Sequence, residues 1–292
     1  MKNRFLCLSV FSAFLIVLFS SSSSSAGEVR GSFIQLNRET ASRGTDYWNG
    51  VLAKMYKAGL SLAIIQWSSE DNIAYIKDSS LEQTEQYNTL DIILEAAQKV
   101  GMEIWLGLHN DQRFWMQIGA RDKALREYFL VRVSQNEKIQ KALLRKYGDN
   151  KTWKGYYIPD EIDDFTWREK SKMAAIREYL SLLISRIQAN DSSGRLVAAS
   201  AFFRPRTAPT VFAANLTDIV ARTGLNIILI QDGRGTIYDT GSYVNEYFAS
   251  LEKFANAKSM PETWCVVEIF EQTSAEGEPF SAKPASAEKV ME

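Results

Sequence analysis

Short apolar runs alternate with longer amphipathic stretches along most of this chain. The runs are rich in Val, Ile, Leu and aromatic residues, as buried strands are. The amphipathic stretches repeat apolar residues every three or four positions, which is the helical period. This alternation predicts a parallel sheet wrapped by helices. We expect strands at residues 31–36, 60–67, 102–108, 153–158, 196–203, 225–230 and 264–270.

The helices expected between these strands carry start and stop signals. Thr45 and Asp46 are capping candidates ahead of one helix, and Gly59 closes it. Pro209 suits the first turn of another. No glycine-rich dinucleotide-binding turn follows the first strand, so we predict an α/β protein with a (β/α)8-type TIM barrel and not an open doubly wound sheet. We expect helices at residues 47–57, 90–100, 125–144, 169–188, 209–224 and 243–257.

The repeat stops before an eighth strand. A loop rich in Ser, Ala, Glu and Pro follows Phe270, and residues 285–292 resemble the start of a seventh helix. We therefore predict one barrel domain at residues 27–292, truncated after its seventh strand. Either the chain is a fragment, or its barrel is open between the first and seventh strands, which would expose two strand edges and favour aggregation.

Residues 1–26 have the pattern of a secretory signal peptide. Lys2 and Arg4 precede an apolar run at residues 5–19. A serine tract then leads to Ala26, after which we expect cleavage. A retained anchor helix is the alternative, but the run is shorter than the ~20 residues that span a bilayer. We predict export to the periplasm or the medium, with no stable membrane insertion after cleavage.

Composition narrows the classes of partner and cofactor. The formal net charge is −1 and no long basic run occurs, so neither a nucleic-acid groove nor a surface for anionic membranes is indicated, and neutral substrates fit better. Cys7 leaves with the signal peptide, which excludes an intramolecular disulfide. Cys265 lies in a predicted strand, where a buried small hydrophobe is favoured over a nucleophile.

Metal binding is not expected either. His109 is the only histidine, which argues against a zinc site. An oxygen-only Ca²⁺ or Mg²⁺ site among the acidic residues 160–164 is the remaining alternative. We predict no metal and no cofactor.

Two carboxylates end strand-like apolar runs. Glu161 follows the run at residues 153–158, and Glu268 ends the run that begins at Trp264. Enzymes with a TIM barrel assemble their active sites at the carboxyl ends of the barrel strands. A pair of carboxyls about 5 Å apart suits retaining glycoside hydrolysis, and a pair roughly 6.5–9.5 Å apart suits the inverting reaction. The structural alternatives are a helix-entry carboxylate for Glu161 and a salt-bridged strand-end acid for Glu268.

Five segments, at residues 31–36, 64–67, 155–162, 231–235 and 267–270, follow one another along nearly the whole chain after residue 27. In these segments the chain resembles the domain-of-unknown-function family 4434, which is grouped with the glycosidase barrels. The resemblance implies a relation to the retaining glycosidases of clan A, with the acid/base on strand four at Glu161 and the nucleophile on strand seven at Glu268. Three departures from the clan pattern stand out: Asp160 replaces the usual Asn, Gln231-Asp232-Gly233 replaces a His and Tyr pattern, and the strand-eight aromatic has no counterpart.

Other polar and aromatic residues follow the predicted strands and are candidates for substrate binding. Amide groups pair with sugar hydroxyls, and indole rings stack on sugar faces. Among the tryptophans near strand exits, Trp67, Trp115 and Trp167, we favour Trp67. His109 has a structural, hydrogen-bonded role as its alternative. The candidates are Gln35, Gln66, Trp67, His109, Asn110, Asp160, Arg204, Gln231 and Asp232.

These patterns predict an exported protein that cleaves or binds a polysaccharide through carboxylate acid/base and nucleophilic chemistry. The alternative is a non-catalytic carbohydrate-binding or scaffold protein on a truncated barrel. The two differ in whether hydrolysis depends on Glu161 and Glu268.

Overall fold

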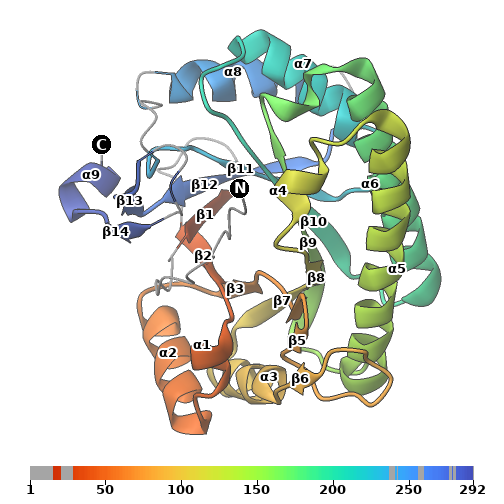
Figure 1. Cartoon of the computed structure of the whole chain (residues 1–292). Coiled ribbons are helices and arrows are strands. Elements are labelled where there is room, and N and C mark those ends of the chain that lie inside the picture. Colours follow the sequence, from red (N-terminus) through yellow and green to blue (C-terminus); the bar gives the residue numbers. More distant parts are fainter. Residues whose placement is uncertain are drawn as a thin grey trace.

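A closed barrel organises the computed structural model of this chain (Figure 1). The structure describes residues 16–20, 29–236, 241, 243–255, 260–275, 278 and 281–291. The strands are parallel from β2 round to β12, which confirms the predicted TIM-type barrel with seven parallel strands. In chain order these are β2 (Val29–Ile34), β3 (Leu62–Ile65), β7 (Glu103–Gly107), β9 (Trp153–Asp163), β10 (Leu196–Phe202), β11 (Ile227–Gln231) and β12 (Glu262–Glu268).

Strand β1 (Ile16–Ser20) takes the eighth position of the barrel, between β2 and β12. It runs antiparallel to both, with Leu18 opposite Gly31 and Val266. It belongs to the segment that we predict to be a signal peptide, and the expected cleavage point at Ala26 lies outside the described residues. No eighth strand–helix unit occurs among the described residues, so the gap expected between strands one and seven is here filled by β1.

Helices cover the outside of the barrel, as Figure 1 shows. Their apolar faces meet the outer faces of the strands in one large core, and neighbouring helices such as α5 and α6 pack side by side. Within the described part of the chain, none of the helices is long and apolar enough to cross a bilayer. The main helices are α2 (Thr45–Lys57), α3 (Thr89–Val100), α5 (Asp122–Tyr147), α6 (Lys170–Asn190), α7 (Pro209–Val220) and α8 (Val244–Ala255); α1 (Arg38–Ala41), α4 (Phe114–Gln117), η1 (Thr166–Arg168) and α9 (Ala287–Met291) are short.

A second, smaller core fills the barrel. Its residues alternate with outward-facing ones along each strand, as the strand period of two requires. Trp105 belongs to this core, and a Cβ atom on Gly155 would lie 2.5 Å from the Trp105 ring, so only glycine fits opposite the indole. Because apolar side chains fill the interior of the barrel, polar groups can gather only at the carboxyl ends of the strands. The buried members are Phe33, Leu62, Ile64, Trp105, Tyr157, Ala198, Ile227, Leu229 and Val266.

The acidic segment after Ile158 is part of a strand and not a loop. Strand β9 continues to Asp163, where we expected it to end at Ile158. Its register against β10 shifts between Ala199 and Ala201, and pairing then resumes with Ile162 opposite Ala201. A shift of this kind re-aims side chains at a strand end. Glu161 therefore lies in the irregular part of the strand, between the paired residues Ile158 and Ile162.

Two small sheets lie outside the barrel and were not predicted. One has the order β6-β5-β4-β8 and follows the ends of β3 and β7; the other is the hairpin β13-β14 after β12. Strands of two or three residues are too short to show a period, which explains why the sequence pattern missed them. Their bounds are β4 (Ser69–Glu70), β5 (Ile73–Ala74), β6 (Glu85–Gln86), β8 (His109–Asn110), β13 (Phe270–Gln272) and β14 (Ala282–Pro284).

Candidate active site

Glu161 and Glu268 lie at the same end of the barrel. They come from β9 and β12, the fourth and seventh parallel strands, and β10 and β11 lie between them. Gln231 ends β11, and its Nε2 donates a hydrogen bond of 2.7 Å to Oε1 of Glu161. The strand ends thus bring two of the predicted polar residues into contact with each other.

The Glu161 carboxyl titrates far above its usual range. Burial raises its pKa to about 7, while the Gln231 hydrogen bond and the Arg204 guanidinium act in the opposite direction. The nearby charges of Asp163 and Asp160 raise it further. Glu161 as a whole residue is half-buried, whereas Glu268 is buried. A carboxyl that is protonated near neutral pH and still reachable is suited to proton donation.

The Glu268 carboxyl is more deeply buried, with 6% of its surface exposed. Burial and then the charge of Asp232 raise its pKa to about 8. The backbone N–H of Gly235 donates a 2.8 Å hydrogen bond to Oε2 and acts in the opposite direction. Only glycine allows this approach, because a Cβ atom at position 235 would lie 2.8 Å from the Phe270 carbonyl oxygen.

The turn after β11 connects this carboxylate to Asp232. Oδ1 of Asp232 accepts hydrogen bonds of 3.2 Å from the backbone N–H groups of Arg234 and Glu268. Burial raises the pKa of Asp232 to about 6. Gly233 has φ +68°, a left-handed conformation that favours glycine. Asp232 therefore ties the ends of β11 and β12 together beneath Glu268.

The two glutamates interact electrostatically. The charge of Glu161 raises the pKa of Glu268, and the Arg204 guanidinium lowers the pKa of both carboxyls. Arg204 follows β10, and its backbone N–H donates a 3.0 Å hydrogen bond to Oδ1 of Asp164. Because the carboxyls interact, their protons are lost in steps that belong to the pair. A pair that holds one proton near neutral pH has one acid and one base available.

Gln35, Gln66 and Trp67 lie at the ends of β2 and β3. The Gln66 backbone N–H bonds to the Ile34 carbonyl, and its buried side-chain Oε1 has no hydrogen-bond partner among the described residues. Gln35 is partly buried. Nε1 of Trp67 donates to the Leu36 carbonyl at 2.9 Å, and the ring packs against the outer core. Trp67 therefore has a structural role, and its ring is packed against the protein core.

The exposed aromatic surface is at Trp115 instead. Trp115 is 45% exposed and its ring lies 5.6 Å from that of Phe202, whereas Trp167 is buried. Phe202 pairs in register with Gln231, the hydrogen-bond partner of Glu161. The aromatic side chain best placed to stack on a sugar at this mouth is Trp115.

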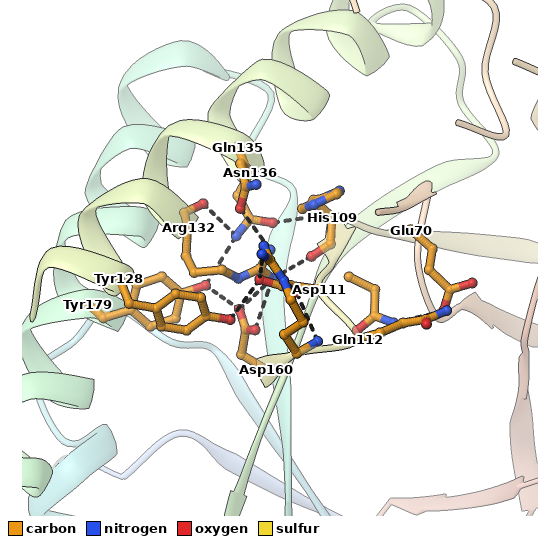
Figure 2. A network of polar contacts seen from close by, with 12 residues as sticks. Glu70, His109, Asp111, Gln112, Tyr128, Arg132, Gln135, Asn136, Asp160 and Tyr179 are labelled. Carbon is orange, nitrogen blue, oxygen red and sulfur yellow. Dashed lines mark hydrogen bonds and ion pairs between the residues drawn. The ribbon is translucent and has the colours of Figure 1, made fainter. Parts of the chain in front are cut away.

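Asp160, which we expected to bind substrate, is bound within the protein. Both of its oxygens accept hydrogen bonds from Nη2 of Arg132, at 2.9 and 3.1 Å, and the Tyr179 hydroxyl also donates to it. Figure 2 shows this carboxylate among the side chains of α5 and α6. The side chain is 2% exposed, so it is not offered to a ligand.

His109 and Asn110 belong to the same region behind the mouth. The His109 ring is buried, and its Nδ1 lies 2.7 Å from the Ser69 hydroxyl. Asn110 Nδ2 donates to Oε1 of Glu70 at 3.0 Å. The structure therefore does not bring these two residues together with Glu161 and Glu268.

The sequence analysis missed Arg132, which is fully buried in α5. Its signal was present, because Leu125, Phe129 and Asn136 share the same helix face at spacings of three and four. A charged residue on a core-facing stripe requires a buried partner. The partner here is Asp160.

The acidic cluster at residues 160–164 is divided among different partners. Asp160 binds Arg132, Asp163 accepts from the backbone and hydroxyl of Thr166, and Asp164 accepts from backbone N–H groups after β10. Within the described residues, no group of three or more His, Cys, Asp or Glu side chains is placed to hold a metal ion. Cys265 is partly buried in β12, and burial raises the pKa of its thiol to about 12, so it is not an activated nucleophile.

Comparison with known proteins is consistent with this geometry. A family model described as "Domain of unknown function (DUF4434)" matches residues 29–292. The uncharacterized protein YbcH of Escherichia coli (strain K12) is 28% identical over 238 residues, which is 81% of this chain and 74% of that protein.

Solved structures of glycoside hydrolases have a similar fold. A putative alpha-L-fucosidase from Bacteroides thetaiotaomicron aligns with a TM-score of 0.65 and 15% identity, covering 100% of this chain and 85% of its own. The endo-1,4-beta-mannanase of Rhizomucor miehei aligns with a TM-score of 0.51 and 14% identity, covering 83% and 80%. At these identities the likeness shows a glycoside-hydrolase-like barrel and no activity.

Proposed function

This chain belongs to the DUF4434 family, and its barrel resembles those of glycoside hydrolases. From this fold and its two buried carboxyls, we propose that the protein is an exported glycoside hydrolase acting on a neutral polysaccharide. The observation that carries the proposal is the pair Glu161 and Glu268, which lie near the ends of the fourth and seventh parallel strands. Burial raises the pKa of both carboxyls, and the charge of Glu161 raises the pKa of Glu268 further. Burying a carboxyl costs free energy, and buried carboxyls with shifted pKa values are typical of functional sites.

The proposed reaction has two steps, with roles assigned from the strand positions of clan A. This reaction needs the single proton of the pair on Glu161, although Glu268 has the higher pKa, so the reactive form is the less populated one at neutral pH. In that form ionised Glu268 attacks the anomeric carbon while Glu161 donates its proton to the departing glycosidic oxygen, so a glycosyl ester forms as the glycosidic bond breaks. Water then attacks the ester, Glu161 takes the water proton, and the Glu268 carboxylate is released. The Gly235 N–H fixes Oε2 of Glu268, which leaves the other oxygen for attack.

Neighbouring groups support these roles. Gln231 orients Glu161 through its 2.7 Å hydrogen bond, and Arg204 stabilises negative charge on either carboxyl. Trp115, exposed beside Phe202, supplies a face for a sugar ring. The lack of a net basic surface suits an uncharged polymer.

The test is hydrolysis of a panel of neutral polysaccharides by the wild type, Glu161→Gln and Glu268→Gln. We expect turnover to fall by at least ~10³-fold in both variants, because each loses a group that acts in the transition state, while binding of the same polymer is retained. Glu262→Gln is the matched control, since Glu262 lies at the opposite end of β12 and is exposed. Wild-type protein that binds a polymer without cleaving it would instead support the non-catalytic alternative.

A further inference from the structure

A cavity lies outside the barrel, between α5 and the small sheet β6-β5-β4-β8. Its volume is about 280 Å³. That is close to the lower end of the ~300–1,000 Å³ that ligand sites occupy, so it suits one small molecule and not a stretch of polymer. Neither Glu161 nor Glu268 lines it. The lining residues are Asp71, Asn72, Leu81, Glu82, Gln83, His109, Gln135, Lys138 and Ile139.

His109 forms a wall of this cavity and is held in place from three directions. Its backbone N–H donates to Oδ1 of Asn136 at 2.9 Å, its carbonyl accepts from Arg132 at 2.6 Å, and its Nδ1 lies 2.7 Å from the Ser69 hydroxyl. Burial and the Arg132 charge lower the pKa of the imidazole to about 3, so the ring is neutral. Since Nδ1 bonds to Ser69, Nε2 remains for a ligand, and it makes no hydrogen bond to any described residue.

Gln135 adds a donor to the same cavity. Its Oε1 accepts a 3.3 Å hydrogen bond from Nη1 of Arg132, which leaves the amide NH₂ on the other side. Figure 2 shows Gln135 and His109 at one end of the network centred on Arg132. Arg132 therefore fixes both the ring and the amide, so the two polar groups are preorganised.

Acceptors and an apolar surface complete the lining. One oxygen of Asp71 accepts from the Gln112 backbone N–H at 3.2 Å, and the other is left for a ligand. Glu82 and Lys138 form an ion pair and cancel each other's charge. Leu81 and Ile139 are buried apolar residues at the same cavity. The cavity thus combines donors, acceptors and an apolar patch without an unpaired cation.

We propose that this cavity binds one neutral, hydroxyl-rich ring, of the size of a monosaccharide, at a site separate from Glu161 and Glu268. Hydroxyl groups need donors and acceptors together, which Gln135, His109 and Asp71 supply, and a C–H group of such a ring can contact the small exposed part of Leu81. The carboxylate of Asp71 disfavours anionic ligands. The inference does not depend on the proposed hydrolysis.

Binding is tested by protein-observed NMR titration of the full chain with D-glucose, D-xylose and myo-inositol, and with D-glucuronate as an anionic counterpart. We expect millimolar affinity for at least one neutral probe and weaker binding of glucuronate. The variant Trp115→Ala, which removes the exposed ring proposed to bind sugar at the barrel mouth, should bind with unchanged affinity. Loss of binding in that variant would locate the ligand at the barrel mouth and overturn the proposal, as would tighter binding of glucuronate or no saturation at tens of millimolar.

Two variants test the cavity itself. Gln135→Leu and Gln83→Leu keep most of the side-chain volume and remove hydrogen-bonding groups, so each should weaken the neutral probe by roughly 3- to 10-fold. Gln98→Leu, on an exposed position of α3, is the matched control and should leave affinity unchanged. Circular dichroism establishes that each variant is folded. Unchanged affinity in both folded cavity variants contradicts the proposed site.

Discussion

Glu268 ends a strand whose other inward residues are apolar, and its environment links proton binding to folding. In the unfolded chain its pKa is near the ordinary 4.5, and in the folded chain burial beside Asp232 raises it to about 8. The folded state therefore binds the proton more tightly. This group's contribution to the free energy of unfolding is largest below pH 4.5 and is lost as the pH rises toward 8.

Replacing Glu268 by Gln should remove this pH dependence. Glutamine keeps an acceptor for the Gly235 N–H but cannot ionise, so we expect similar stability at pH 5 and higher stability than wild type at pH 8 to 9. A shift from 4.5 to about 8 corresponds to an upper limit of roughly 5 kcal/mol at ~1.4 kcal/mol per pH unit. Urea unfolding across this pH range measures it. Glu262→Gln should keep the wild-type slope; an identical slope in Glu268→Gln would contradict the linkage.

The sequence predicts the position of a single residue correctly where the strand pattern alone decides the end of the barrel at which the residue lies. Glu161, Gln231 and Glu268 follow apolar runs, and counting strands was enough to place them at one end of the barrel. It could not find the contact between Arg132 and Asp160, because partners far apart in the chain are chosen by helix packing and not by local pattern. The orientation of Trp67 and Trp115 depends on the loops that carry them, which have no periodicity.

At the level of elements, helix α5 is joined to the ends of β7 and β9 by one buried arginine. Nη2 of Arg132 binds the His109 carbonyl beyond β7 and the Asp160 carboxylate of β9. Asn136, one turn later, reinforces the contact through the His109 N–H and the Tyr179 hydroxyl. Because Asp160 precedes Glu161, this contact fixes the strand that carries the proposed proton donor.

Removing the arginine should therefore destabilise the protein strongly. Arg132→Met leaves Asp160 buried without its cation, and we expect a loss of about 3–5 kcal/mol in the free energy of unfolding. The double variant Arg132→Met/Asp160→Asn should recover part of this loss, since no uncompensated charge remains. Arg145→Met, in the same helix but half exposed in its pair with Asp78, should cost less than about 1 kcal/mol. Urea unfolding measures these free energies. The proposed contact is contradicted if the loss in the double variant equals the sum of the losses caused by the two single substitutions.

The pattern of long elements was predictable and the pattern of short ones was not. Every parallel strand and every long helix appears where the sequence indicates it, with ends displaced by a few residues. Strand β9 runs further than expected because its pairing with β10 resumes after a register shift. That shift depends on the neighbouring strand, which no local window contains.

At the scale of the whole molecule, closure of the barrel depends on β1. We propose that residues 1–26 are removed during export, which would take β1 away from its neighbours. Exported protein should then begin at Gly27, as N-terminal sequencing of the periplasmic or secreted product can establish. The facing edges of β2 and β12 would need another partner or solvent.

Protein made from residue 27 onward should accordingly be less stable than the full chain, or self-associated through its free edges. Unfolding measurements and light scattering compare the two. Full-length protein with Leu18→Pro is the control, because proline cannot donate to the ladder and should weaken β1 pairing without shortening the chain. A monomer from residue 27 that is as stable as the full chain would show that β1 is dispensable.

The pairing of β1 with β12 also sets an order in time. β1 is the first barrel strand to be synthesised and β12 the last, so Ser20 is made long before Trp264, its partner in the ladder. At ~5–20 residues per second, the interval between them is roughly 12–50 seconds. Throughout that interval β1 can pair only with β2, so one of its edges has no partner strand. If residues 1–26 direct export, as we propose, the export machinery would meet them in this half-paired state. Slow translation would lengthen the interval, whereas a chain completed before it is recognised can close its own barrel around the segment that we propose directs its export.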